Sequence, residues 1–191
     1  MGERQGPDRL EEESAAIAQE VVQRAAARGL RLAAAESLTG GLLAARLIDV
    51  PGASACVAGG AVCYALDAKT DVLGVDAQLL RREGAVTAEV ARQMARGAAR
   101  LYRADLALAT TGVAGPGPDD RGVPAGTVWI ALASRSGPAL VRELRLSGDR
   151  AQVRGEAVRA ALALLRDRLR DSAASPQASE PSLPAGEREE S

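Results

Sequence analysis

The sequence contains no histidine, and only three of its 191 residues are aromatic. Without histidine a Ser-His-Asp triad is impossible, and a zinc site would have to use carboxylates and two thiols. Tyr64, Tyr102 and Trp129 are too few to stack nucleic-acid bases between basic side chains, and the formal net charge of −1 shows no basic excess. We therefore expect neither a metal ion nor a nucleic-acid partner.

Cysteine is scarce, and long apolar runs are absent. Cys56 and Cys63 lack CxxC spacing and lie in an apolar stretch, which is typical of buried thiols in a cytoplasmic protein. No run reaches the roughly 18 apolar residues that a membrane span needs. The polar N-terminal stretch MGERQGPDRLEEES does not have the pattern of a signal peptide. These features predict a cytoplasmic location and no membrane partner.

Lysine occurs once, at position 69, and the other basic residues are all arginine. Arginine stays protonated at any working pH, whereas a desolvated lysine can lose its proton. Because histidine is absent, Lys69 is a candidate base for activating a serine hydroxyl. The alternative is an ordinary exposed lysine after a strand. The S-x-x-K pattern is excluded, since Leu66 stands three residues before Lys69, so a nucleophile must come from elsewhere in the fold.

Apolar strands alternate with amphipathic helices between two polar ends. Residues 1–9 and 172–191 are predicted to be disordered, which leaves one domain at 10–171. Strands are expected at 30–35, 57–64, 105–111, 126–134 and 141–146, and helices at 14–28, 42–48, 87–101 and 149–169. The alternation predicts an α/β sandwich with a mostly parallel sheet, which a hairpin between the last two strands makes mixed.

The stretch AESLTGG, at 35–41, lies between a predicted strand and a predicted helix. Ligands of open α/β sheets bind at such strand ends. Thr39 is either the N-cap of the helix or part of a site where backbone N–H groups hold an anion or an oxyanion. Taken alone, this stretch does not decide between the two.

The glycine-rich segment 110–120 and the GDR sequence ending at Arg150 also interrupt the regular pattern. The glycine-rich segment is either a wide turn or a backbone cradle in which Thr110 or Thr111 donates to a substrate. Arg150, at the start of the last helix, is either a surface charge or a phosphate ligand.

Six segments in this order resemble the CinA C-terminal domain family, over about residues 14–167. They are AESLTGG, Tyr64 to Lys69 followed by LGV, GAVTAEVARQMARGA, TGVAGPGP, PAGTVWIALA and GDR. Because this sequence does not include the large N-terminal domain of full-length CinA proteins, we expect the stand-alone amidohydrolase form. The resemblance implies a three-layer α/β/α sandwich with a mixed, mostly parallel sheet. It also implies hydrolysis of nicotinamide mononucleotide to nicotinic acid mononucleotide and ammonia in pyridine-nucleotide recycling, without metal or organic cofactor, by a homo-oligomer.

The matched motifs also imply a set of site residues. The catalytic ones are Ser37, Ser54, Tyr64 and Lys69, and the substrate-binding ones are Glu36, Thr39, Gly40, Gly41, Thr111, Gly112, Gly115 and Arg150. A hydroxyl is expected to attack the amide carbon with neutral Lys69 as base and Tyr64 relaying or orienting the proton. Ser54 is preferred over Ser37 as the nucleophile, although either remains open.

The oxyanion is expected at the N–H groups of Gly40 and Gly41, and the phosphate at Arg150. Two positions depart from the family pattern, with Leu38 in place of a usual cysteine and Leu66 in place of a common asparagine. The second departure keeps two alternatives open. They are a catalytically silent nucleotide-binding or regulatory module, and an amidase for another small amide.

Overall fold

Five strands form one mixed sheet in the order β2-β1-β3-β4-β5. The computed structural model describes residues 7–135 and 137–174. The strands are β1 (Leu32–Glu36), β2 (Val57–Val62), β3 (Leu106–Gly112), β4 (Thr127–Ser134) and β5 (Leu140–Arg145). β1 pairs in parallel with both β2 and β3, whereas β4 is antiparallel to β3 and β5. The predicted mixed sheet, including its final hairpin, is confirmed.

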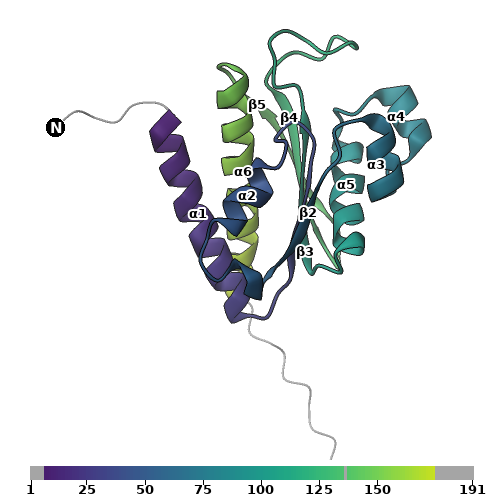
Figure 1. Cartoon of the computed structure of the whole chain (residues 1–191). Coiled ribbons are helices and arrows are strands. Elements are labelled where there is room, and N and C mark those ends of the chain that lie inside the picture. Colours follow the sequence, from purple (N-terminus) through teal and green to yellow (C-terminus); the bar gives the residue numbers. More distant parts are fainter. Residues whose placement is uncertain (1–6, 136, 175–191) are drawn as a thin grey trace, which may run out of the picture.

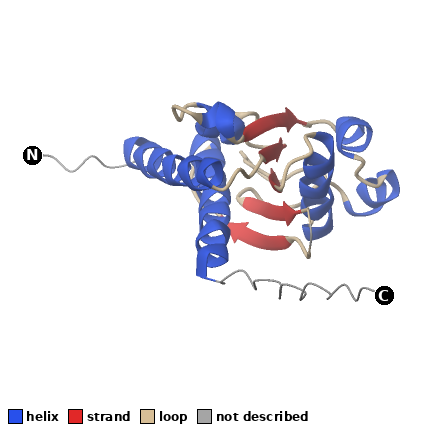
Figure 2. Cartoon of the chain, turned by 90° about the horizontal axis from the view of Figure 1, so that it is seen from below, coloured by secondary structure: helices blue, strands red, loops and turns tan. Residues whose placement is uncertain are grey.

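Helices cover both faces of the sheet and complete the three-layer sandwich (Figures 1 and 2). One face carries α1 (Pro7–Ala27), α2 (Leu42–Ile48) and α6 (Arg150–Ala174), and the other carries α3 (Leu66–Leu73), α4 (Ala77–Glu83) and α5 (Ala88–Leu101). A single 3-10 turn, η1 (Ala53–Ala55), precedes β2. Two hydrophobic clusters fill the two interfaces between sheet and helices. The predicted fold class is therefore confirmed.

Small side chains let the helices approach the sheet and one another closely, which offsets the lack of aromatic residues. β1 is buried along its whole length, as expected for a strand covered on both faces. On its α5 side the core is largely alanine. Within α5, a Cβ at Gly97 would lie 2.1 Å from the carbonyl oxygen of Leu73, the last residue of α3. Any side chain at position 97 would therefore push α3 away from α5.

The predicted starts of α5 and α6 are confirmed by their capping hydrogen bonds. Thr87 accepts a hydrogen bond of 3.2 Å from the N–H of Val90 at the start of α5. At the start of α6, the N–H of Asp149 donates 2.8 Å to the side chain of Gln152, and the N–H of Gln152 donates 2.9 Å to the side chain of Asp149. This reciprocal pair is a capping box, as predicted.

Several boundaries differ from the prediction. α1 begins at Pro7, so residues 7–9 are helical and only 1–6 of the predicted disordered N-terminus lie outside the described residues. α6 continues to Ala174, and the predicted tail beyond it also lies outside the described residues. The two short helices α3 and α4 were not predicted. α3 matters most for function, because it carries Lys69.

Candidate active site

The carboxyl ends of β1 and β2 bring the first candidate residues together. These strands are parallel, with Glu36 beside Val62 in register, so the residues that follow them leave the sheet at the same edge. Ser37 follows β1, while Cys63 and Tyr64 follow β2 and lead into α3. The fold thus delivers Ser37 and the helix that carries Lys69 to one place.

The Lys69 ammonium nitrogen is enclosed by three oxygen atoms. Nζ lies 3.0 Å from Oγ of Ser37 and 2.8 Å from each carbonyl oxygen of Cys63 and Tyr64, and the residue is 1% exposed. A neutral amine has two hydrogens and one lone pair. The two carbonyls accept both hydrogens, so the lone pair is left for the Ser37 hydroxyl. This geometry suits a general base.

Because Lys69 is buried, a larger fraction of its side chain is neutral near physiological pH than for an exposed lysine. Desolvation lowers the pKa of Lys69 from 10.5 to about 8, while interaction with the Cys63 thiol acts in the opposite, raising direction. The Cys63 side chain is itself buried, and desolvation raises its pKa. Lys69 therefore meets a neutral thiol rather than a thiolate at neutral pH, and desolvation decides the sign of its shift.

Ser54 lies at the opposite edge of the sheet from Lys69. It stands in η1, before β2 begins, whereas α3 begins after β2 ends, and its side chain is exposed. The six residues of β2, about 17 Å of extended chain at about 3.3 Å per step, separate the two positions. The expectation that Ser54 attacks with Lys69 as its base is therefore wrong for groups of one chain. Ser37 occupies that position.

Tyr64 contacts Lys69 through its backbone rather than through its phenol. Its carbonyl accepts from Nζ, while its ring is 62% exposed and its hydroxyl lies 3.4 Å from Nη2 of Arg150. No hydrogen bond from the phenol to Ser37 or Lys69 is present among the described residues, so the relay through the phenol stays a prediction. The Arg150 guanidinium also donates 2.7 Å to the carbonyl of Gly115. Arg150 thus joins the end of β2 to the glycine-rich loop.

The carboxylate of Glu36 is used entirely by the start of α2. It accepts from the N–H groups of Gly41 and Leu43 at 3.0 Å each and from that of Ala44 at 2.8 Å. A buried carboxylate in this position replaces an N-cap side chain and complements the positive end of the helix. Glu36 is therefore a structural residue here, and the expected contact to substrate is not supported by its geometry.

The same bonds exclude the expected oxyanion donors. The Gly41 N–H donates to Glu36, and the Gly40 N–H donates 3.1 Å to the carbonyl of Ser37. The N-cap of α2 is Gly41 with φ 96°, which favours glycine, so the alternative that Thr39 caps this helix is also wrong. The Thr39 hydroxyl instead lies 2.6 Å from that of Thr110. Both threonines are buried, and their contact joins the turn after β1 to β3.

Arg154, which the sequence analysis missed, holds this turn from α6. Its Nε donates 2.9 Å to the carbonyl of Leu38, and its Nη2 donates 2.9 Å to that of Thr39. Because C=O and N–H of a trans peptide point in opposite directions, the Thr39 N–H points away from Arg154. No acceptor among the described residues is bonded to the N–H groups of Leu38 and Thr39. The position of Arg154, one helical turn after Arg150, is the sequence signal that could have identified it.

A pocket of about 240 Å³ adjoins this turn. Leu38, Tyr64 and Arg150 line it together with residues 112–119 of the glycine-rich loop. Gly112 and Gly115 therefore line the pocket, and their contact with a substrate stays a prediction. The Thr111 hydroxyl does not donate into it, because it donates 2.8 Å to the carbonyl of Ala85. Ser37 and Lys69 are buried and do not line this pocket, but Leu38, the residue after Ser37, and Tyr64, whose carbonyl accepts from Lys69, both do.

Within residues 7–135 and 137–174, no group of three histidine, cysteine, aspartate or glutamate side chains is placed to hold a metal ion. Over the same residues, no helix combines the length and apolar character needed to cross a membrane.

A sequence profile of the CinA C-terminal domain matches residues 14–169. The chain belongs to this family. A CinA-like protein of Mycolicibacterium gilvum (strain PYR-GCK) is 51% identical over 138 residues, which cover 72% of this chain and 33% of that protein. A CinA-like protein of Frankia casuarinae is 52% identical over 139 residues, which cover 73% and 32%. The chain thus spans about a third of the length of the curated relatives it matches.

Solved CinA structures share the fold of this CinA-family domain. A CinA superfamily protein of Klebsiella pneumoniae superposes with a TM-score of 0.79 at 38% identity, covering 83% of this chain and 98% of that chain. The competence/damage inducible protein CihA of Agrobacterium tumefaciens superposes with a TM-score of 0.79 at 38% identity, covering 89% and 99%. The sandwich described above is therefore the CinA superfamily fold.

Proposed function

We propose that this CinA-family domain is an amidohydrolase that converts nicotinamide mononucleotide to nicotinic acid mononucleotide and ammonia. The observation that carries the proposal is the Ser37–Lys69 pair, whose lone-pair geometry and lowered pKa suit attack by a hydroxyl in a protein without histidine. The resemblance in the matched motifs supports the choice of a carboxamide substrate. No metal or organic cofactor takes part in the steps below.

In the first half-reaction, Oγ of Ser37 bonds to the amide carbon as its proton passes to Nζ of Lys69. The carbonyl π electrons move to oxygen and form a tetrahedral oxyanion. Lys69, now protonated, gives that proton to the amide nitrogen. The carbon–nitrogen bond then breaks, ammonia leaves, and an ester to Ser37 remains.

In the second half-reaction, neutral Lys69 takes a proton from a water molecule as the water oxygen bonds to the ester carbon. The second tetrahedral intermediate collapses, and the ester bond to Oγ breaks. Lys69 returns its proton to Ser37, and the carboxylic acid product loses its own proton to solvent and leaves as a carboxylate. The same nitrogen thus serves as base and acid twice in each turnover.

The oxyanion is assigned to the N–H groups of Leu38 and Thr39. Leu38 directly follows the nucleophile, and the Thr39 N–H points away from the guanidinium of Arg154. Preoriented donors of this kind stabilise the developing charge because they need no reorganisation during the reaction. Arg154 is then a positioning residue, which acts through the peptide units that it holds.

The pocket beside Arg150 supports a mononucleotide as the substrate class. Its glycine-rich wall offers backbone rather than bulky side chains, which permits close approach of a flat ring. The Arg150 guanidinium already bridges Tyr64 and Gly115 at the rim, where it is exposed to a phosphate from solution. We assign the phosphate to Arg150 and the pyridine ring to the pocket.

Ammonia release from nicotinamide mononucleotide tests the proposal directly. Wild-type protein is expected to release ammonia, and Lys69→Arg is expected to release none, because arginine keeps the charge but cannot accept a proton. Since a guanidinium is larger than an ammonium group, the fold of the variant is checked by its melting temperature. Full activity in folded Lys69→Arg would remove the base assignment.

The same assay separates the two remaining alternatives. Binding of the mononucleotide by isothermal titration without ammonia release would identify a catalytically silent nucleotide-binding module. Release of ammonia from other pyridine or non-pyridine amides, but not from the mononucleotide, would identify an amidase with another substrate. Neither result is expected if Ser37 and Lys69 hydrolyse a substrate that Arg150 holds by its phosphate.

A homo-oligomer remains part of the proposal. β2 is an edge strand without charged side chains, and apolar side chains at Val62, Tyr64 and Leu66 are 53%, 62% and 47% exposed at its end and just beyond. Uncovered edges and apolar patches of this kind favour association. Light scattering on the purified chain gives the oligomeric state.

A further inference from the structure

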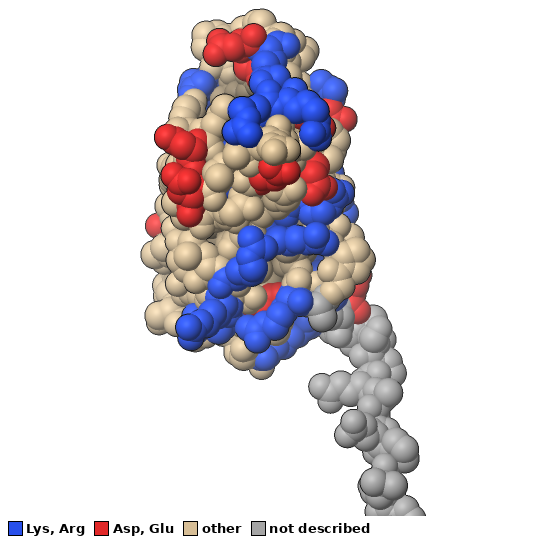
Figure 3. Space-filling view, turned by 90° about the vertical axis from the view of Figure 1, so that its right-hand side faces the viewer, with Lys and Arg blue, Asp and Glu red and all other residues tan. Residues whose placement is uncertain are grey.

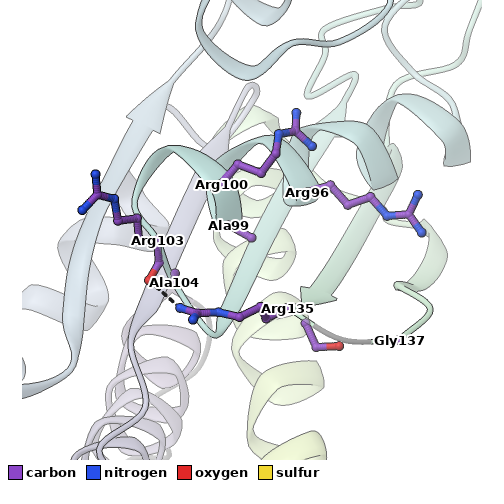
Figure 4. Close-up of a pocket in the computed structure, with 8 residues that line it drawn as sticks. Arg96, Ala99, Arg100, Arg103, Ala104, Arg135 and Gly137 are labelled. Atoms are coloured by element: carbon purple, nitrogen blue, oxygen red, sulfur yellow. Dashed lines mark hydrogen bonds between the residues drawn. The ribbon is translucent and has the colours of Figure 1, made fainter.

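A second pocket, of about 650 Å³, lies at the opposite edge of the sheet from Ser37. Four arginines line it: Arg96, Arg100, Arg103 and Arg135. Arg96 and Arg100 project from α5, Arg103 lies between α5 and β3, and Arg135 follows β4. In Figure 4 the four side chains extend in different directions from α5, from the loop after it and from the end of β4, and Figure 3 shows basic side chains gathered on this face of the molecule.

Positive charge around this pocket is largely uncompensated. Within the described part of the chain, Asp105 is the one carboxylate in ion-pair distance of these four side chains, 3.3 Å from Arg135. It also accepts a hydrogen bond from the backbone N–H of Arg31. Four guanidinium groups and one carboxylate leave a net charge of +3 around the pocket.

This arrangement differs from that of three other arginines on helices of the protein. Arg92, Arg159 and Arg170 each pair with a glutamate. By contrast, Arg96 and Arg100 stand four residues apart on one helix without an acidic neighbour, a spacing at which like charges repel. Such repulsion is reduced when an anion binds between the charges.

Arg103 adds a second, independent observation. It has φ 50°, and among the described residues it is the one non-glycine residue with positive φ. Glycine occupies thirteen other positive-φ positions and would fit here without strain. Its guanidinium donates no hydrogen bond within the described residues. The strained backbone therefore holds an arginine side chain at the pocket rim without a protein partner.

We propose that this arginine pocket binds a small organic anion with two or more linked phosphate groups, of the nucleoside di- or triphosphate class. Guanidinium groups bind phosphate oxygens in pairs, and several phosphates are needed to reach several of the spaced arginines. A concave site favours a small molecule over an extended polyanion. The lining residues include no aromatic side chain for stacking nucleic-acid bases, and the chain as a whole is slightly acidic.

Isothermal titration of the full chain with inorganic tripolyphosphate tests the proposal. The probe is expected to bind more tightly than inorganic phosphate, and its affinity should fall as salt rises. The double variant Arg96→Gln, Arg103→Gly should weaken binding by about tenfold or more, since two charge-assisted contacts are lost. Arg100 is left intact because it also donates 3.1 Å to Leu73 at the end of α3.

Glycine at position 103 separates binding from folding. Because glycine accepts this φ without strain, the melting temperature of Arg103→Gly without ligand should not fall, while tripolyphosphate affinity should. Arg142→Gln removes one charge from the exposed surface of β5, as Arg103→Gly removes one from the pocket, so it is the matched control for that single variant and should bind like wild type.

Four results would overturn the proposal. The first is wild-type tripolyphosphate affinity in the double variant, and the second is a loss of affinity in Arg142→Gln as large as that in the pocket variants. The third is a loss of affinity in Arg150→Gln while the double variant keeps wild-type affinity. The fourth is tighter binding of an oligonucleotide or an acidic peptide than of tripolyphosphate. The third result would place the anion at the first pocket. The last would show that a macromolecule occupies this surface. None of these results depends on amidase activity.

Discussion

The Nζ atom of Lys69 lies 3.0 Å from Oγ of Ser37, although 32 positions separate the two residues in the chain. One follows β1 and the other sits on the helix after β2, so the parallel pairing of these strands creates the contact. Two carbonyl oxygens orient the amine, and burial lowers its pKa. The geometry around Lys69 therefore depends on the two carbonyls, on burial and on the turn that carries Ser37.

The rate of ammonia release should rise with pH through an apparent pKa near 8. Only neutral Lys69 can accept the Ser37 proton, and burial lowers the pKa of Lys69 to about 8. The neutral fraction then rises about tenfold between pH 7 and pH 9, and kcat/KM should follow it. A steady-state pH profile measures this. A rate independent of pH across that range would exclude Lys69 as the titrating base.

Ser37→Ala should abolish ammonia release, whereas Ser54→Ala should leave most of it. The first variant removes the hydroxyl beside Nζ, and the second removes an exposed hydroxyl at the other edge of the sheet. Loss of the nucleophile is expected to cost about 10³-fold or more in kcat. If the two variants exchanged these outcomes, attack by Ser54 from a second chain would replace the assignment made here.

Replacing Arg154 should lower kcat with little effect on KM. In Arg154→Met, the carbonyls of Leu38 and Thr39 lose both donors, and the oxyanion N–H groups lose their orientation. Removing one oxyanion donor typically lowers kcat by about 10²- to 10³-fold. Arg154→Lys, which can donate to one of the two carbonyls, should recover part of the lost kcat. Arg159→Lys, on the same helix and paired with Glu156, is the matched control. A rise in KM alone would instead indicate a role in substrate binding.

The stability difference between wild type and Lys69→Met should depend on pH. Folding lowers the pKa of Lys69 from 10.5 to about 8, so between these values the unfolded chain binds a proton that the native chain does not. Below pH 8 the native protein carries the full cost of a buried charge, and this cost disappears as the pH rises to 10.5.

Wild type should therefore gain up to about 3 kcal/mol relative to the methionine variant across that window. Urea unfolding of both proteins at pH 7, 8, 9 and 10 gives the difference, and comparing the two cancels the other titrating groups. A constant difference would mean that folding does not shift the pKa of this lysine, as expected for a solvated amine.

Glu36→Gln should destabilise the fold by about 3 kcal/mol, because hydrogen bonds to a buried charged group are worth about 1.5 to 3 kcal/mol each and are only partly replaced. The carboxylate accepts three backbone N–H groups, whereas the amide has one oxygen, and its NH₂ group would face a donor. Chemical denaturation measures the loss. Glu83→Gln on α4, whose carboxylate is 42% exposed, should change stability by no more than about 0.5 kcal/mol.

The long elements were predictable because each repeats one pattern along its length. β1 and β3 are continuous apolar runs, and α5 carries its buried side chains at helical spacing. α3 and α4, with eight and seven residues, are too short to establish a period. Both bury side chains in the hydrophobic cluster that includes α5, and such tertiary contacts cannot be seen in a short segment, so the element that carries the base was missed.

Errors at the site have a related cause. Ser37 and Ser54 both stand in plausible motifs, and no local pattern shows which of them lies at the same end of the sheet as Lys69. Glu36 was expected to bind substrate, because a sequence does not show that both its oxygen atoms are taken by α2. Arg154 was missed, because its partners lie more than 100 residues away in the chain.

The amino-acid sequence by itself determined which chemistry is open to this protein: without histidine, its one lysine is the side chain best suited to act as a base near neutral pH. It also determined the layers, since apolar runs must be covered on both faces. Only the tertiary structure decided which hydroxyl meets that lysine and whether the lysine is desolvated. Both depend on how β1, β2 and α3 pack together, and proximity and burial are properties of packing rather than of any single segment.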